Sequence, residues 1–206
     1  MHIVSIIINL VVALFLLWLC VYRYMKDQYR IALIFSLVNV MSVIWIVWRL
    51  LYLMGVISLT AFGFFAIISD TYSGLLFFLG AYLSFREKAG RPVILGLVVA
   101  ALLIPFYAFF TMFGNGSDAV KFMPAAIFLG VSEIMLAIML YLFYDVLDKP
   151  LKIKIAVAIL GVGLVGLGIM NPLYYVYTDP LGVTIIEYIS TVMKALIVSG
   201  LFILFF

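Results

Sequence analysis

Charged side chains are scarce in this sequence of 206 residues, of which only 10% are lysine, arginine, aspartate or glutamate. A soluble domain carries about 25% charged residues, and 68% of this chain is hydrophobic. The composition therefore excludes a water-soluble globule and leaves no room for a separate soluble domain. The net charge of +3 comes from residues in the loops, so we expect no binding to nucleic acid.

Two reactive residue types are nearly absent. The one cysteine, Cys20, lies in the first apolar run, where no intrachain disulfide is possible and a small buried hydrophobe is expected. The one histidine, His2, lies at the N-terminus, which excludes histidine-based zinc or acid–base chemistry inside a helix bundle. The sequence also has no glycine-rich phosphate loop, no cysteine pair and no Gly-x-Ser-x-Gly motif. We therefore expect neither an enzyme nor a metal site.

Long apolar runs are what the sequence has instead. A membrane-spanning helix needs about 20 apolar residues, and seven runs reach that length: about 3–22, 31–54, 57–84, 93–113, 123–147, 152–171 and 183–206. The break near Gly55 is the weakest, because no charge marks it. The polar–apolar alternation of a barrel is absent. The sequence predicts one all-α membrane domain over residues 1–206, a bundle of seven transmembrane helices in the lipid bilayer.

Basic residues predict the orientation of this bundle. The first, third and fifth loops hold nine of them, whereas the even-numbered loops hold only Lys121; the nine are Arg23, Lys26, Arg30, Arg86, Lys88, Arg91, Lys149, Lys152 and Lys154. Cytoplasmic loops are enriched in lysine and arginine, so we expect the N-terminus outside and the C-terminus in the cytoplasm. The sequence ends on an apolar segment at Phe206, and we expect a cytoplasmic output domain to follow it in the natural protein.

Three ionisable residues fall in the middle of separate predicted spans: Asp70, Glu133 and Lys194. A charge in the hydrocarbon core is costly and marks a candidate functional residue. Residues three or four apart share a helix face, and further polar residues follow this spacing. These stripes are Ser36, Asn39, Ser42 and Arg49; Asp70 and Ser73; Glu133, Ala137 and Tyr144; and Thr184, Glu187, Ser190, Thr191 and Lys194. We expect an interior ligand-binding pocket lined by Asn39, Arg49, Asp70, Glu133, Glu187 and Lys194.

Two alternatives remain open for these charges. In one, they line a pocket or pathway, and a neutral Lys194 can form a Schiff base with a carbonyl ligand. In the other they are structural, with Lys194 paired to Asp70 or Glu133 and a second pair between Arg49 and Glu187.

Other features predict packing and loop structure. Pro105 is expected to kink the fourth span. Small residues in the sixth span predict close helix packing, with a hinge as the alternative; they are Ala156, Ala158, Gly161, Gly163, Gly166 and Gly168. A predicted outer loop at 171–182 carries three tyrosines, Tyr174, Tyr175 and Tyr177. We expect them to form part of an interfacial belt, and the alternative is a lid over an outward-facing pocket. Asn115-Gly116-Ser117 matches a glycosylation acceptor.

A weak internal repeat relates the first three spans to the last three. Ile68-Ser69 aligns with Ile189-Ser190, and Tyr22 aligns with Tyr144, at similar offsets along the chain. Parallel repeats joined by a linking helix occur in some transporters, so the repeat favours a transport pathway.

The layout resembles that of seven-helix rhodopsin-like proteins, with a lysine in the seventh span and an aspartate in the third. In microbial rhodopsins these positions hold the retinal-linking lysine and its counterion, which the resemblance assigns to Lys194 and Asp70. The sequence departs from the family at Ser190, where the family has aspartate, and at Thr71, where it has tryptophan. The chain also resembles the seven-helix sensor regions of prokaryotic signalling proteins such as membrane-bound histidine kinases, which implies the cell membrane of a prokaryote.

The sequence therefore predicts a receptor-like sensor that detects a small molecule, an ion or a proton and signals toward the cytoplasm. A small transporter or ion pathway using Asp70, Glu133 and Lys194 is the first alternative. A retinal-binding photoreceptor or pump is the second, and retinal is the only cofactor considered.

Overall fold

The computed structural model describes residues 2–27, 30–85, 90–114, 118–143, 149–176 and 180–206. In this part of the chain the fold is all-α, without strands, and each of its seven helices is long and apolar enough to cross a membrane. These findings indicate a multi-pass integral membrane protein. The helices are α1 His2–Asp27, α2 Arg30–Leu53, α3 Leu59–Phe85, α4 Arg91–Phe113, α5 Asp118–Phe143, α6 Leu151–Val176 and α7 Pro180–Phe205.

A glycine turn separates α2 from α3. Gly55 has φ +72°, in the left-handed region that favours glycine because it has no Cβ. Its N–H donates to the carbonyl of Tyr52, and the N–H of Val56 donates to the carbonyl of Leu51. This is the Schellman arrangement that ends many helices, and it explains why the uncharged gap predicted near Gly55 divides two spans.

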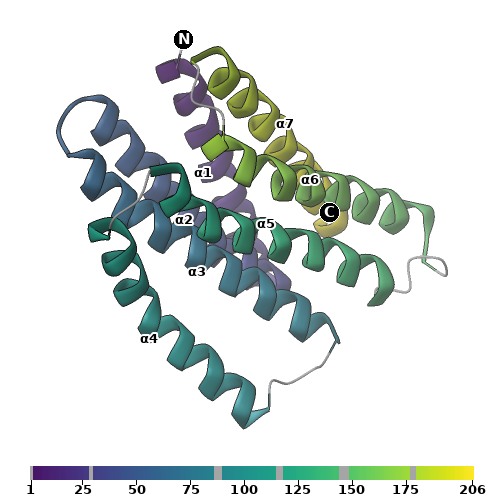
Figure 1. Ribbon diagram of the computed structural model, residues 1–206. Helices are drawn as coiled ribbons and strands as arrows, with labels where there is room; N and C mark the ends of the chain where they lie inside the picture. The colour runs from purple at the N-terminus through teal and green to yellow at the C-terminus, as the bar shows by residue number, and fades with distance from the viewer. Residues whose placement is uncertain (1, 28–29, 86–89, 115–117, 144–148, 177–179) are drawn as a thin grey trace.

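The contacts among six helices close a ring, and α4 lies apart from the other helices (Figure 1). Around the ring, α1 packs on α2, α2 on α3, α3 on α5, α5 on α6, α6 on α7, and α7 on α1, whereas α4 packs mainly on α3. Only 11% of the apolar stretch of α4 is buried, against 50% for α5. The interior is therefore built by α1, α2, α3, α5, α6 and α7, and α4 is peripheral.

This packing order is compatible with the predicted repeat, as is that of any ring of six helices in chain order. If α1, α2 and α3 are exchanged with α5, α6 and α7, every contact between neighbouring ring helices maps onto another such contact. The peripheral α4 then occupies the place of a linking helix between two groups of three.

Small residues bring α6 close to both of its neighbours, as the sequence predicts. A Cβ added to Gly168 would lie 2.6 Å from the carbonyl oxygen of Gly130 on α5, and one added to Gly163 would lie 2.8 Å from that of Met193 on α7. Gly161 differs, because a Cβ added there meets nothing within 4 Å. The glycines of α6 thus allow backbone contact on two sides, and Gly161 is not one of them.

The predicted loop at 171–182 is wrong in its first half, because α6 continues to Val176. Pro172 lies inside the helix, where neighbouring helices in a membrane protein can offset the lost hydrogen bond. Tyr174 and Tyr175 are therefore helical residues and not loop residues, and both line an interior cavity. Some predictions fall outside the described residues: those on Arg86 and Lys88, on Tyr144 and Tyr177, and on the acceptor motif at 115–117.

Candidate functional site: a polar cavity inside the helix ring

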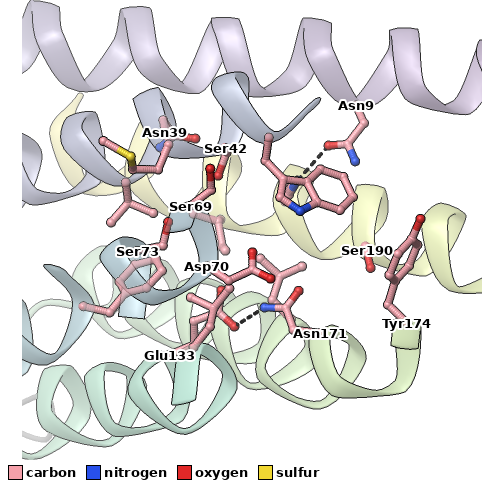
Figure 2. A pocket seen from close by; sticks show the side chains of 18 of the residues that line it. Asn9, Asn39, Ser42, Ser69, Asp70, Ser73, Glu133, Asn171, Tyr174 and Ser190 are labelled. Atoms are coloured by element: carbon pink, nitrogen blue, oxygen red, sulfur yellow. Dashed lines mark hydrogen bonds between the residues drawn. The ribbon is translucent and has the colours of Figure 1, made fainter. Parts of the chain in front are cut away.

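A cavity of about 110 Å³ lies within the ring of six helices. Side chains from each ring helix line it and none comes from α4. Figure 2 shows polar groups from several helices pointing into the same space. All six residues predicted to share a pocket are among the lining residues: Asn39, Arg49, Asp70, Glu133, Glu187 and Lys194. The structure thus brings together charges that the sequence separates by up to 145 positions.

One part of the cavity wall is a buried ion pair. The guanidinium of Arg49 on α2 forms a salt bridge with the carboxylate of Glu187 on α7, and these residues are 6% and 4% exposed. The hydroxyl of Ser5 donates to Oε2 of Glu187 at 2.6 Å. The guanidinium also lies 4.8 Å from the ring centroid of Tyr174 and 5.3 Å from that of Trp45. The pairing of Arg49 with Glu187 proposed as a structural element is therefore present.

The two carboxylates in the middle of the bundle are held by neutral donors from α6. The hydroxyl of Tyr175 donates to Oδ2 of Asp70 at 2.9 Å, and Nδ2 of Asn171 donates to Oε2 of Glu133 at 2.8 Å. Asp70 lies on α3 and Glu133 on α5, so each bond joins two ring helices. Figure 2 shows both acidic side chains and Asn171 directed toward the same region of the cavity.

Lys194 on α7 also has a neutral partner. Its ammonium donates to Oδ1 of Asn9 on α1 at 2.8 Å. Within the described residues, Lys194 forms no salt bridge with Asp70 or with Glu133. The structural alternative in which this lysine locks the bundle by pairing with one of these carboxylates is therefore not the arrangement found. An amide from α1 takes the place of that carboxylate.

Tryptophan adds one more polar group to the cavity wall. Nε1 of Trp45 is a buried donor without a hydrogen-bond partner among the described residues, and Trp45 lines the cavity. The indole ring is packed edge-on against Phe62 and Tyr174, with centroid distances of 6.0 and 5.8 Å. This packing holds the ring in place, with the side chain of Tyr175 within interaction range.

The predicted polar stripes divide into two kinds of residue. Ser42, Ser73 and Ser190 line the cavity together with the charged residues. By contrast, the hydroxyls of Ser36 and Thr191 donate to carbonyls four residues earlier in their own helices, at 2.7 and 2.8 Å. Such local bonds satisfy a hydroxyl without a tertiary partner, and neither residue lines the cavity.

Sequence reasoning missed the neutral partners of all three central charges. Asn9 was overlooked because a lone asparagine in an apolar run is a weak signal, although Ser5 lies four positions before it on the same helix face. Asn171 and Tyr175 have the same four-residue spacing. They were hidden by the expectation that Pro172 ends the sixth span. A continuous helix through Pro172 places both side chains on the interior face.

Comparisons with protein-family models, with curated proteins and with solved structures gave no match to this chain. The chemistry available is that of the cavity itself, which carries one ion pair and, in addition, two carboxylates and one ammonium that form no salt bridge among the described residues. In the described part of the chain, no three histidine, cysteine, aspartate or glutamate residues come close enough to hold a metal ion.

Proposed function

We propose that this protein is a receptor-like membrane sensor that binds a small hydrophilic ligand, an ion or a proton in the cavity of the helix ring. The observation that carries this proposal is the state of three charged residues. Asp70, Glu133 and Lys194 face one cavity, and each is hydrogen-bonded to a neutral side chain. Unpaired charges inside a membrane bundle are costly and mark functional sites.

Binding in this cavity has a direct route to a change in helix packing. Lys194 and Glu187 both lie on α7, which packs against α6 and α1. A ligand that draws Lys194 away from Asn9 breaks a bond between α7 and α1. A signal requires different ligand affinities for two states of the bundle, and a bond that is broken on binding supplies that difference. With the predicted orientation, α7 leads toward the cytoplasm.

The size of the cavity favours a small solute. Pockets for drug-sized ligands measure about 300–1,000 Å³, whereas this cavity measures about 110 Å³. An ion, a few water molecules or a compact metabolite fits this volume better than an extended chromophore such as retinal. The volume therefore favours sensing of a small polar species over the photoreceptor alternative.

A thermal-shift experiment tests the proposal. The protein in lipid nanodiscs is heated with NaCl, sodium acetate, methylammonium chloride and glycine, and at several pH values. We expect at least one condition to shift the unfolding temperature of the wild type and to lose this effect in Lys194→Gln. Lys121→Gln is the matched control, because the ammonium of Lys121 donates to the carbonyl of Met112 and does not line the cavity.

Two outcomes would contradict sensing in this cavity. One is a set of shifts that is the same in Lys194→Gln and in the wild type. The other is a Lys194→Gln protein that fails to fold, as seen by circular dichroism and gel filtration, while Lys121→Gln folds. The second outcome would give Lys194 a purely structural role.

A transport function is the second candidate, and the charged residues Asp70, Glu133 and Lys194 that line the cavity support it. The order of contacts among the ring helices is compatible with a transporter built from three helices, a linker and three helices. We expect proton or sodium flux in proteoliposomes that falls at least tenfold in Asp70→Asn. Asp27→Asn serves as the control, since Asp27 pairs with Arg23 at the end of α1. Absence of flux under every imposed gradient would count against transport.

A further inference from the structure

The cavity wall carries hydrogen-bond donors and acceptors that can form further bonds, and the two kinds come from different helices. Lys194 has an ammonium with three protons, of which one is directed to Asn9. Nε1 of Trp45 is a buried donor with no partner in the described residues. Asp70 and Glu133 each accept one hydrogen bond, although a carboxylate has about four lone-pair sites. The wall thus offers donors from α2 and α7 and acceptors from α3 and α5.

The indole N–H is the sharpest of these features. A buried donor without a partner costs about 1–3 kcal/mol, so such groups in native proteins require an explanation. Arg49 lies over the face of the Trp45 ring, Phe62 and Tyr174 pack against the ring, and the side chain of Tyr175 lies within interaction range of it. An acceptor that enters the cavity would compete with the Tyr175 hydroxyl for this N–H.

A ligand with a single charge satisfies only one side of this wall. An anion bound at Lys194 and Trp45 shares a small cavity with Asp70 and Glu133, which repel it. A cation bound at these carboxylates leaves the donors of Lys194 and Trp45 without an acceptor. A molecule with a negative and a positive end can satisfy both the donors and the acceptors, and it leaves the net charge of the cavity unchanged.

We propose that the ligand is a small zwitterion of amino-acid type. Its carboxylate accepts from the ammonium of Lys194 and from Nε1 of Trp45, and its ammonium donates to Asp70 and Glu133. This inference rests on the proposed function, namely that the cavity binds a small polar species. A volume of about 110 Å³ restricts the ligand to compact members of the class such as glycine and L-alanine.

Isothermal titration calorimetry on the full chain in nanodiscs tests this proposal. The probes are glycine and L-alanine, with acetate and methylammonium as ligands that carry only one of the two charges. We expect measurable binding of glycine or L-alanine, and at least tenfold weaker binding of acetate and methylammonium. L-Tryptophan, as a zwitterion too large for the cavity, is expected not to bind.

Two tryptophan variants give a matched comparison. Trp45→Phe keeps an aromatic ring but removes the N–H, and a hydrogen bond to a charged group contributes enough that its loss should weaken binding about 10- to 100-fold. Trp48→Phe is the control, because Trp48 stacks on Phe65 at 3.6 Å and does not line the cavity. Lys194→Gln should weaken binding at least as much as Trp45→Phe.

The outcomes separate this proposal from the proposed function. If acetate or methylammonium binds as tightly as glycine, or if Trp45→Phe and Trp48→Phe bind alike, the zwitterion is overturned while sensing of a small ion stands. If a folded wild type binds neither glycine nor L-alanine, the zwitterion is likewise overturned. If, in addition, no condition of the thermal-shift experiment shifts the unfolding temperature in a way that depends on Lys194, the proposed function is overturned together with the zwitterion. These tests on the wild type remain decisive even if a variant fails to fold.

Discussion

The buried pair of Arg49 and Glu187 should be strongly coupled in stability. Removing one partner of a buried pair leaves an uncompensated charge and costs about 3–5 kcal/mol. We expect Glu187→Met near the lower end, since the guanidinium keeps the faces of Trp45 and Tyr174. Arg49→Met should lie near the upper end, because it leaves the buried carboxylate of Glu187 without its cationic partner and also removes both ring contacts.

The double variant decides whether the pair acts as a unit. With both charges replaced by methionine no charge is stranded, so the loss should not exceed that of Arg49→Met. The two single effects should then fail to add by about 3 kcal/mol. The free energy of unfolding can be measured by SDS titration in mixed micelles, followed by tryptophan fluorescence. Effects that add to within about 0.5 kcal/mol would refute the reasoning.

A less buried pair supplies the control for this cycle. Arg23 and Asp27 form a salt bridge four residues apart on α1, with side chains 15% and 34% exposed. Ion pairs at the surface contribute only about 0–1 kcal/mol, so the same cycle on this partly exposed pair should show weaker coupling than the cycle on Arg49 and Glu187. Comparable coupling in both pairs would mean that burial is not the cause.

Further predictions concern single side chains. Gly168→Ala should destabilise the protein by about 1–3 kcal/mol, because the added Cβ would meet a backbone oxygen of α5 at 2.6 Å. Gly161→Ala should be neutral or stabilising, because a Cβ added there meets no atom within 4 Å. Equal effects of the two substitutions on SDS unfolding would contradict the close packing of α6 on α5. Tyr175→Phe should cost about 1–3 kcal/mol, since it removes the hydroxyl that donates to the buried Asp70. Tyr72→Phe should cost only about 0.6 kcal/mol, because it removes one hydrogen bond from α3 to the backbone of the peripheral α4. A larger loss of stability in Tyr72→Phe than in Tyr175→Phe would show that the contact with α4 matters more to stability than the bond in the cavity does.

Much of the architecture follows from composition and run length. Seven apolar runs of about 20 residues predict seven helices, because only helices and closed barrels satisfy the backbone in lipid and these runs lack the alternation of barrel strands. Membership of the cavity was also predictable for charged residues such as Asp70 and Glu133, since a charge on a membrane helix must face inward. The N-out orientation remains a prediction from the loop charges.

The partners of these charges were not predictable, because they depend on how helices distant in the sequence meet. Asn9 faces Lys194 only because α1 closes the ring against α7. Tyr175 reaches Asp70 only because α6 runs through Pro172. Periodicity places a residue on one face of its own helix, but it does not show which residues of another helix that face will contact.

The sequence by itself determined that the chain is a bundle of membrane helices with buried charges, because hydrophobicity and spacing are properties of each segment alone. Only the tertiary structure decided between the alternatives for these charges, namely that Arg49 pairs with Glu187 while Lys194, Asp70 and Glu133 have neutral partners. It likewise decided that α4 stays outside the ring. These outcomes depend on which helices pack together, and that choice is made by contacts between segments far apart in the chain.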